Sequence, residues 1–203
     1  MPSKKRSTIS RKDRQQPETS PRFLLDRSLG RHQLAAQLAS AGFDVTPGDD
    51  AYSQDERDPW IFYDAGKKGM VVITSDKEFM KSFPHMAAIT LGRTTALAFT
   101  SNNYKSNVRG KALIKARGRI LKAIAKARGE PFIGSIGMDG NFNIVERNPR
   151  PSRKYCDERD WRSYENVCRI EGVQFEGPKS SSPEIRGGDD GSAEDQAGTE
   201  SAR

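Results

Sequence analysis

The chain has 203 residues, 34% of them hydrophobic, and its mean hydropathy of −0.79 is low for a chain that folds along its whole length. No run approaches the roughly 18 apolar residues that cross a bilayer, so we expect no transmembrane helix and no membrane partner. The two cysteines, Cys156 and Cys168, are too few for a disulfide framework or a zinc site, and a reducing cytoplasm is the expected location.

The net charge of +7 is unevenly distributed. Residues 1–20 are rich in Ser, Gln, Lys and Arg, lack apolar periodicity and are predicted to form a disordered basic arm. Residues 179–203 are rich in Ser, Gly and acidic side chains and are also predicted to be disordered. A basic surplus favours an anionic partner such as nucleic acid, but a solubilising surface explains the charge equally well.

The first predicted elements are a strand, a helix and a strand. The short apolar run 23–25 is typical of a strand that is buried on both faces of a parallel sheet. Ser28 is the predicted N-cap of a helix that Gly42 ends. Residues 43–45 are predicted to form the second strand.

A second helix and the strongest strand follow. Asp58 and Pro59 are typical of a helix start, because the N–H that proline lacks would be unpaired there anyway. Gly69 is predicted to end this helix near residue 68. Residues 70–74 are unbroken in their apolar character and mostly β-branched, which predicts a strand.

The second half of the pattern is mainly helical and closes in a hairpin. Residues 96–99 predict a strand, whereas 87–91 fits either a helix or a strand. Apolar residues recur at helical spacing over 107–128 and predict a long amphipathic helix. Asp139-Gly140 predicts the turn of a hairpin within 132–145.

This order of elements predicts an α/β fold with a mainly parallel sheet between helices, because strand–helix–strand crossovers are right-handed. We place the domain at residues 21–147 and treat 1–20 as a separate arm. The extension 148–203 is expected to be largely disordered, with one short docking helix before its acidic tail.

Acidic residues follow two predicted strands at the point where each strand ends. Asp26 comes directly after 23–25, and Asp76 follows 70–74. Asp58 begins the helix that leads into the second of these strands, so it is expected on the same side of the sheet. Parallel α/β sheets bind ligands at the edge that the carboxyl ends of their strands form, so the three carboxylates are predicted to converge at that edge.

Each aspartate also has a purely structural explanation. Asp58 is a good helix cap. Asp26 is placed to cap a turn or to pair with Arg27 or Arg31. Asp76 is placed to cap the helix that follows it. Taken together, the three positions favour a functional site over three unrelated caps.

Clustered carboxylates repel one another until a cation binds. Mg²⁺ or Mn²⁺ suits such hard oxygen ligands, and one or two ions are both compatible with the pattern. The chemistry expected at this site is phosphodiester hydrolysis by a metal-activated water. Asp55 and Glu56 lie just upstream and are second candidates to supply or replace a ligand.

Three segments of the chain resemble a known family. They are Phe23-Leu24-Leu25-Asp26-Arg27-Ser28-Leu29-Gly30, Asp58-Pro59-Trp60-Ile61 and Val71-Val72-Ile73-Thr74-Ser75-Asp76-Lys77-Glu78-Phe79. With Glu130-Pro131-Phe132-Ile133 and the hairpin after it, residues 22–146 resemble the PIN-like domain family, relatives of the VapC ribonucleases of bacterial toxin–antitoxin systems.

The resemblance implies a three-layer α/β/α sandwich and a Mg²⁺- or Mn²⁺-dependent nuclease that hydrolyses RNA. It also implies that Asp26, Asp58 and Asp76 are the catalytic metal ligands. Thr74 and Ser75 match positions whose hydroxyl supports the last ligand, and Glu78 is the candidate for the fourth acidic residue common in the family.

The predicted long helix is strongly basic. Nine basic residues and no acidic one lie between Lys105 and Arg128. The basic side chains on such a helix repel one another, and a bound polyanion would relieve this repulsion. The RNA-binding candidates are Lys105, Arg109, Lys111, Lys115, Arg119 and Lys122. A solvated face and an acidic protein partner remain open as alternatives.

Other polar residues carry weaker signals. His32 and His85 are better explained as surface or helix-end residues than as general bases. Asn102, Asn103 and Tyr104 are candidates to line an RNA groove, with the ring stacking on a base, although a loop turn explains them as well.

The leading hypothesis is an endoribonuclease for single-stranded RNA, the toxin of a toxin–antitoxin pair with an antitoxin protein as partner. The alternative is a catalytically silent PIN-like module that binds RNA or protein through the basic surface. A phosphoacceptor receiver domain shares the acidic edge, but the spacing supports it poorly. The sequence leaves open whether the protein forms a homodimer.

Overall fold

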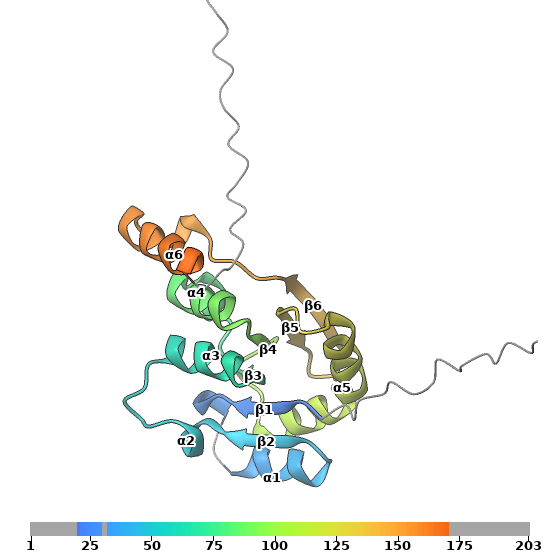
Figure 1. Ribbon diagram of the computed structural model, residues 1–203. Coiled ribbons are helices and arrows are strands. Elements are labelled where there is room, and N and C mark those ends of the chain that lie inside the picture. Colours follow the sequence, from blue (N-terminus) through green and yellow to red (C-terminus); the bar gives the residue numbers. More distant parts are fainter. Residues whose placement is uncertain (1–19, 30–31, 171–203) are drawn as a thin grey trace, which may run out of the picture.

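A twisted central sheet organises the computed structural model, which describes residues 20–29 and 32–170 (Figure 1). The described residues form a six-stranded sheet in the order β2-β1-β3-β4-β5-β6, parallel except for β6. Its strands are β1 (Arg22–Leu25), β2 (Asp44–Pro47), β3 (Met70–Thr74), β4 (Thr95–Phe99), β5 (Phe132–Ile136) and β6 (Phe142–Arg147).

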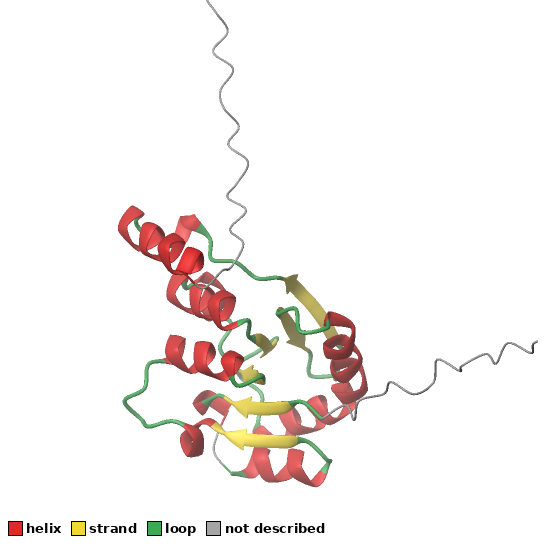
Figure 2. Ribbon diagram, in the orientation of Figure 1, coloured by secondary structure: helices red, strands yellow, loops and turns green. Residues whose placement is uncertain are grey.

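Helices cover both faces of this sheet (Figure 2). The α-helices are α1 (Gln33–Ser40), α2 (Gly48–Ala51), α3 (Asp58–Lys67), α4 (Phe83–Gly92), α5 (Ser106–Ala127) and α6 (Glu158–Ile170). Short 3₁₀ turns are η1 (Arg27–Leu29), η2 (Glu78–Lys81) and η3 (Arg153–Tyr155). The predicted three-layer α/β/α sandwich is confirmed.

Alternate residues of the inner strands supply two separate hydrophobic cores. In β3, Val71 and Ile73 face the core that α1 and α5 cover, whereas Met70 and Val72 face the core that α3 and α4 cover. Because successive side chains of a strand point to opposite faces, a strand between two helical layers is apolar throughout. All five residues of β3 are accordingly buried.

The ambiguous segment 87–91 lies within α4. This helix is apolar on nearly all sides because it lies between the sheet and α6, so helical periodicity was weak in the sequence. Phe83 of α4 packs against Trp161 and Tyr164 of α6, and Cys168 completes this third cluster. The docking helix expected in the extension is therefore present, while the acidic tail lies outside the described residues.

The predicted helix from Ser28 to Gly42 is interrupted. Ser28 belongs to the 3₁₀ turn η1, and α1 begins only at Gln33, after the undescribed residues 30–31. The assignment of Ser28 as an N-cap was wrong, because its hydroxyl donates to Asp26 instead. Gly42 does follow the helix end, with a φ of +80°. No helix of the described chain is long and apolar enough to span a membrane.

Candidate active site at the carboxyl edge of the sheet

Asp26 and Asp76 follow neighbouring parallel strands at the same edge. Asp26 comes directly after β1 and Asp76 two residues after β3, and the register pairs Leu25 with Ile73. The backbone N–H of Asp26 donates to the carbonyl of Ile73 at 2.8 Å, which extends the strand pairing by one residue. In Figure 1 the arrowheads of β1 and β2 point toward this edge, on the left. Ligands of open α/β sheets bind at such edges.

Thr74 connects the two aspartates. Its hydroxyl donates to Oδ2 of Asp26 at 2.7 Å and accepts a hydrogen bond from the backbone N–H of Asp76 at 3.0 Å. The side chain is only 1% exposed, so the protein fixes both partners of the hydroxyl. The family resemblance implied that this hydroxyl supports the last ligand, Asp76; in the structure it accepts from the N–H of Asp76 and donates to the carboxylate of Asp26.

A second hydroxyl relay reaches the same carboxylate oxygen. Ser28 donates to Oδ2 of Asp26 at 2.6 Å, and Ser75 donates to the hydroxyl of Ser28 at 2.9 Å. Ser75 is buried, whereas Asp26 is half-buried. Two hydroxyl donors therefore orient the carboxylate of Asp26 and leave Oδ1 without a hydrogen bond from any described residue.

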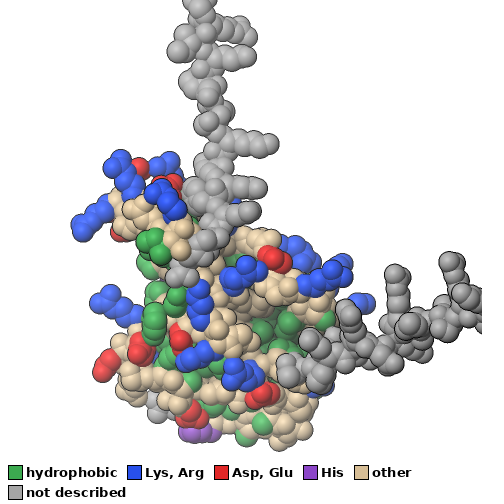
Figure 3. Space-filling model, viewed as in Figure 1, with side chains coloured by type: hydrophobic (Ala, Val, Ile, Leu, Met, Phe, Trp, Pro, Cys, Tyr) green, Lys and Arg blue, Asp and Glu red, His purple; other side chains and the backbone are tan. Residues whose placement is uncertain are grey.

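Asp58 reaches this edge from another element and is held by Arg27. Nη2 of Arg27 lies 2.9 Å from Oδ1 of Asp58, and the same guanidinium donates to the carbonyls of Gln54 and Glu56 at 2.9 and 2.7 Å. These contacts of Arg27 connect the loop before α3 to η1. Acidic side chains gather beside this loop and the start of α3, on the left of Figure 3. Asp58 is the first residue of α3, and its side chain remains 60% exposed.

Asp76 has a second local contact, and the carboxylates of Glu78 and Glu56 have partners of their own. Oδ1 of Asp76 accepts the backbone N–H of Glu78 at 2.7 Å, so Asp76 also has the capping role considered from the sequence. The carboxylate of Glu78 pairs with Lys81 at 3.0 Å on the surface. The carboxylate of Glu56 lies near Tyr52, where burial, a hydrogen bond to Asp64 and the charge of Glu56 raise the pKa of the phenol.

His85 lies within reach of all three aspartate charges. It occupies the first turn of α4, where Nδ1 lies 2.7 Å from the hydroxyl of Ser82 and the ring contacts Phe62 edge-on at 5.7 Å. Burial lowers the pKa of His85, and the carboxylates of Asp58, Asp76 and Asp26 oppose that shift. The sequence favoured a surface or helix-end role for this histidine, because nothing local links position 85 to the strand ends.

The family comparison agrees with this geometry. Residues 21–101 match the family model described as a PIN like domain. This chain contains a PIN-like domain. The match begins just before β1 and ends just after β4, so it includes Asp26, Asp58 and Asp76. No curated protein and no solved structure gives a match to the chain.

The donors of the PIN-like domain suit a hard divalent cation. Asp26 and Asp76 offer carboxylate oxygens at one edge, and the hydroxyls around them are also oxygen donors. Mg²⁺ is commonly held by one or two carboxylates and keeps several waters, which two aspartates satisfy. No group of three or more Asp, Glu, His or Cys residues within 20–29 and 32–170 is close enough to hold an ion. Asp58 would have to leave Arg27 to complete such a set.

Parts of the basic helix α5 have structural roles in the PIN-like domain. Arg109 is 7% exposed and donates to the carbonyl of Asn102 at 2.8 Å, and burial lowers the pKa of its guanidinium. Arg117 donates to the carbonyl of Gly42 at 3.0 Å. Arg119 donates to the side-chain oxygen of Asn141 at 3.3 Å. The exposed lysines of α5 form a stripe, because steps of four and seven residues return to nearly the same face. We define the lysine stripe as Lys111, Lys115, Lys122 and Lys126.

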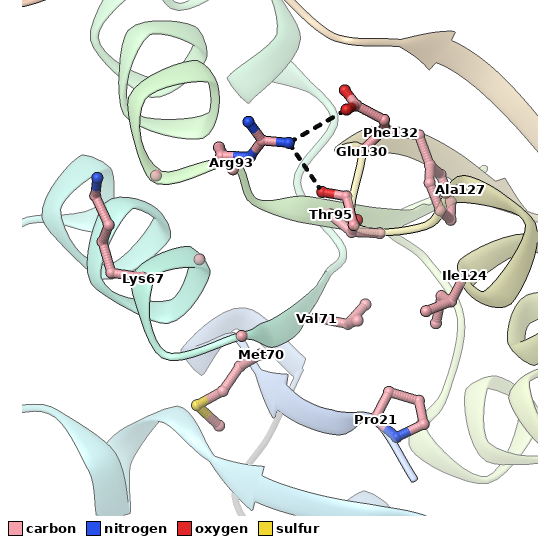
Figure 4. Close-up of a pocket in the computed structure, with 14 residues that line it drawn as sticks. Pro21, Lys67, Met70, Val71, Arg93, Thr95, Ile124, Ala127, Glu130 and Phe132 are labelled. Carbon is pink, nitrogen blue, oxygen red and sulfur yellow. Dashed lines mark hydrogen bonds and ion pairs between the residues drawn. The ribbon is translucent and has the colours of Figure 1, made fainter. Parts of the chain in front are cut away.

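A pocket of about 360 Å³ opens at the opposite edge of the sheet. Its lining includes the first residues of three parallel strands, Met70, Thr95 and Phe132. Arg93 and Glu130 form an ion pair of 3.3 Å at this pocket (Figure 4). Since the strands are parallel, their starts lie at the far end of the sheet from Asp26 and Asp76. This pocket is separate from the carboxylate site.

The role of Thr74 leads to a test of the site. Thr74→Val keeps the shape but leaves Asp26 with one donor fewer and the N–H of Asp76 without its acceptor. We expect the affinity of this site for Mn²⁺ to fall about 10- to 100-fold, the usual loss when a residue that orients a metal ligand is removed. Thr90→Val is the control: Thr90 is also buried, and its hydroxyl donates to the carbonyls of Met86 and Pro149, far from the edge. Equal losses of Mn²⁺ affinity in both variants would contradict the role of Thr74 in connecting Asp26 and Asp76.

Proposed function

We propose that this protein is a metal-dependent endoribonuclease, a hydrolase that cuts phosphodiester bonds of single-stranded RNA. The observation that carries the proposal is the pair Asp26 and Asp76 on adjacent parallel strand ends, joined through the buried hydroxyl of Thr74. Membership of the PIN-like family makes a nuclease the first activity to test.

In this proposal Asp26 and Asp76 hold Mg²⁺ or Mn²⁺, with Asp58 as a third ligand once Arg27 releases it. The bound cation would activate a water and neutralise charge on the phosphate. Thr74 and Ser28 keep the carboxylate of Asp26 in one orientation, with Oδ1 directed away from the hydroxyls. Such preorganisation matters because a ligand that must reorient on binding loses affinity.

The lysine stripe is the proposed contact for the RNA backbone. Lys111 and Lys122 are both exposed, and eleven residues correspond to three helical turns on the same side of α5. No acidic residue lies on this helix to neutralise them. Lys115 packs its stem against Gly140 and is also exposed.

We expect a Lys111→Ala, Lys122→Ala double variant to bind single-stranded RNA less tightly and with weaker salt dependence. The slope of log affinity against log salt should decrease by about 0.7 per lost phosphate contact. Fluorescence anisotropy of a labelled oligonucleotide at several salt concentrations measures the slope. Arg162→Ala on α6 is the control, because that cation already pairs with Glu158 at 3.2 Å. An unchanged slope in the double variant would exclude the stripe as the RNA contact.

The decisive assay for the function is cleavage of mixed single-stranded RNA by the full chain with Mn²⁺ or Mg²⁺. Cleavage that stops with EDTA supports the nuclease. RNA binding without cleavage under any of these metals would favour the second candidate, a catalytically silent PIN-like module that binds RNA or protein. The ion pair between Arg27 and Asp58 is the observation that favours this second candidate, because it neutralises one candidate ligand.

A toxin role in the cytoplasm is a narrower form of the same proposal. A ribonuclease that cuts cellular RNA should arrest growth when it is expressed, and an antitoxin partner would relieve the arrest. Growth after induction of the full chain tests this directly. Continued growth with active nuclease in the lysate would separate the enzymatic activity from a toxin role.

A further inference from the structure

One exposed aromatic side chain lies beside the candidate active site. Trp60 belongs to the first turn of α3, two residues after Asp58, and its side chain is 50% exposed. A tryptophan is costly to leave in water, since it carries a large apolar ring. Figure 3 shows hydrophobic side chains in green next to acidic ones in red over the start of α3.

The ring of Trp60 is supported on one side. Its centroid lies 5.3 Å from that of Tyr63, with an angle of 31° between the planes, and Nζ of Lys67 lies 5.2 Å from the centroid of Tyr63. These residues follow one another along the outer face of α3. Contact with Tyr63 limits the rotation of the indole, while half of its surface stays open to a ligand.

One exposed cation lies beside Trp60, among the acidic side chains at the start of α3. Arg57 immediately precedes α3, is exposed and forms no ion pair with a described residue. The start of a helix carries partial positive charge, which favours phosphate there. First-turn side chains lean toward the N-terminus of their helix, so Trp60 leans toward the carboxyl edge of the sheet.

We propose that Trp60 is a substrate-positioning residue that stacks on an unpaired base next to the phosphate cut at the carboxylate edge. This inference rests on the proposed function and deepens it: the substrate is a strand with at least one base free to leave its stack. Every base has a π face, so the stacking selects single strands rather than a sequence. Duplex RNA, whose bases are already stacked, is a poor ligand for this residue.

Tyr104, the stacking candidate of the sequence, also has contacts within the fold. Its ring packs edge-on against Phe99, and its hydroxyl lies 3.0 Å from that of Thr100. The ring is half-buried, which leaves less of its face for a base.

The two tryptophans of the chain allow a direct test by fluorescence. Trp161 is 6% exposed and donates from Nε1 to Glu165 at 2.7 Å, so it should not respond to RNA. We expect a single-stranded RNA oligonucleotide, added to the full chain in EDTA, to quench the emission. Trp60→Phe should abolish the quenching, and Trp60→Ala should weaken binding of the same oligonucleotide about 5- to 150-fold. Val145→Ala, which shortens a 55% exposed apolar side chain on β6, should leave the affinity unchanged.

The outcomes distinguish this inference from the proposed function. Wild-type affinity in Trp60→Ala, or equal quenching by duplex RNA, would overturn the stacking role even if cleavage is established. Stacking without any cleavage would overturn the nuclease; Trp60 would then be an RNA-binding residue and not a substrate-positioning one. If Trp60→Ala alters only the oligomeric state or the binding of a protein, the ring is a protein contact and the inference fails.

Discussion

Asp76→Asn is expected to reduce metal-dependent RNA cleavage by at least about 10³-fold, in the range seen when an essential catalytic carboxylate is lost. Asparagine has nearly the same shape and keeps an oxygen that accepts the backbone N–H of Glu78, so the turn into η2 should persist. What is lost is the negative charge that would bind the cation. The measurement is the initial rate of cleavage at saturating Mn²⁺, with unfolding by urea as a check on stability.

The hairpin between β5 and β6 offers a matched control. Oδ1 of Asp139 accepts the backbone N–H of Asn141 at 2.9 Å, the same local hydrogen bond that Asp76 makes with Glu78. Asp139→Asn should therefore have a similar small effect on stability and none on cleavage. If both variants cleave RNA as the wild type does, Asp76 is only a cap of the turn into η2, and the proposed metal site at this edge is wrong.

Gly92→Ala is expected to lower the free energy of unfolding by about 1–3 kcal/mol, the usual cost of overpacking a close contact. A Cβ at Gly92 would lie 2.6 Å from the carbonyl oxygen and 2.9 Å from the Cα of Tyr63. Both are backbone atoms of α3, which cannot move aside without shifting the helix. The hydroxyl of Thr94, which is fully buried and donates to Phe62 at 2.6 Å, lies 2.8 Å away.

Gly118→Ala separates packing from helix propensity. Gly118 lies on the exposed side of α5, and a Cβ there would meet nothing within 4 Å. The free energy of unfolding of this variant should rise by up to about 1 kcal/mol, because alanine favours a helix more than glycine does. Urea unfolding followed by circular dichroism gives both values. A similar change in both variants would show that α3 and α4 do not pack as closely as the structure has them.

The sequence predicted most of the layers because their signals are local. Residues 70–74 are unbroken and largely β-branched, and they form β3 with the predicted bounds. The hairpin turn at Asp139-Gly140 and the long basic helix also lie where they were expected. The four-residue helix α2 was not predicted, since Gly48–Ala51 carries no periodic pattern.

Only part of the candidate site could be predicted from the sequence. The sequence identified the two strand-end aspartates, and parallel strands bring such ends to one edge whatever the details of packing. It did not predict the ion pair between Arg27 and Asp58. Arg27 was considered only as a partner for Asp26, which it follows directly in the chain. It also did not connect Ser28 with Ser75, which are 47 residues apart in the chain.

For this protein the sequence by itself determined the α/β class, the strand ends that carry Asp26 and Asp76, and the one-signed charge of α5. Each follows from neighbours within one turn or one strand. Only the tertiary structure decided which oxygen of Asp26 the hydroxyls occupy, which cations of α5 support the fold, and where Trp60 stands. These three features depend on side chains that come together from distant segments of the chain. The packing of the helices on the sheet sets the directions of these side chains.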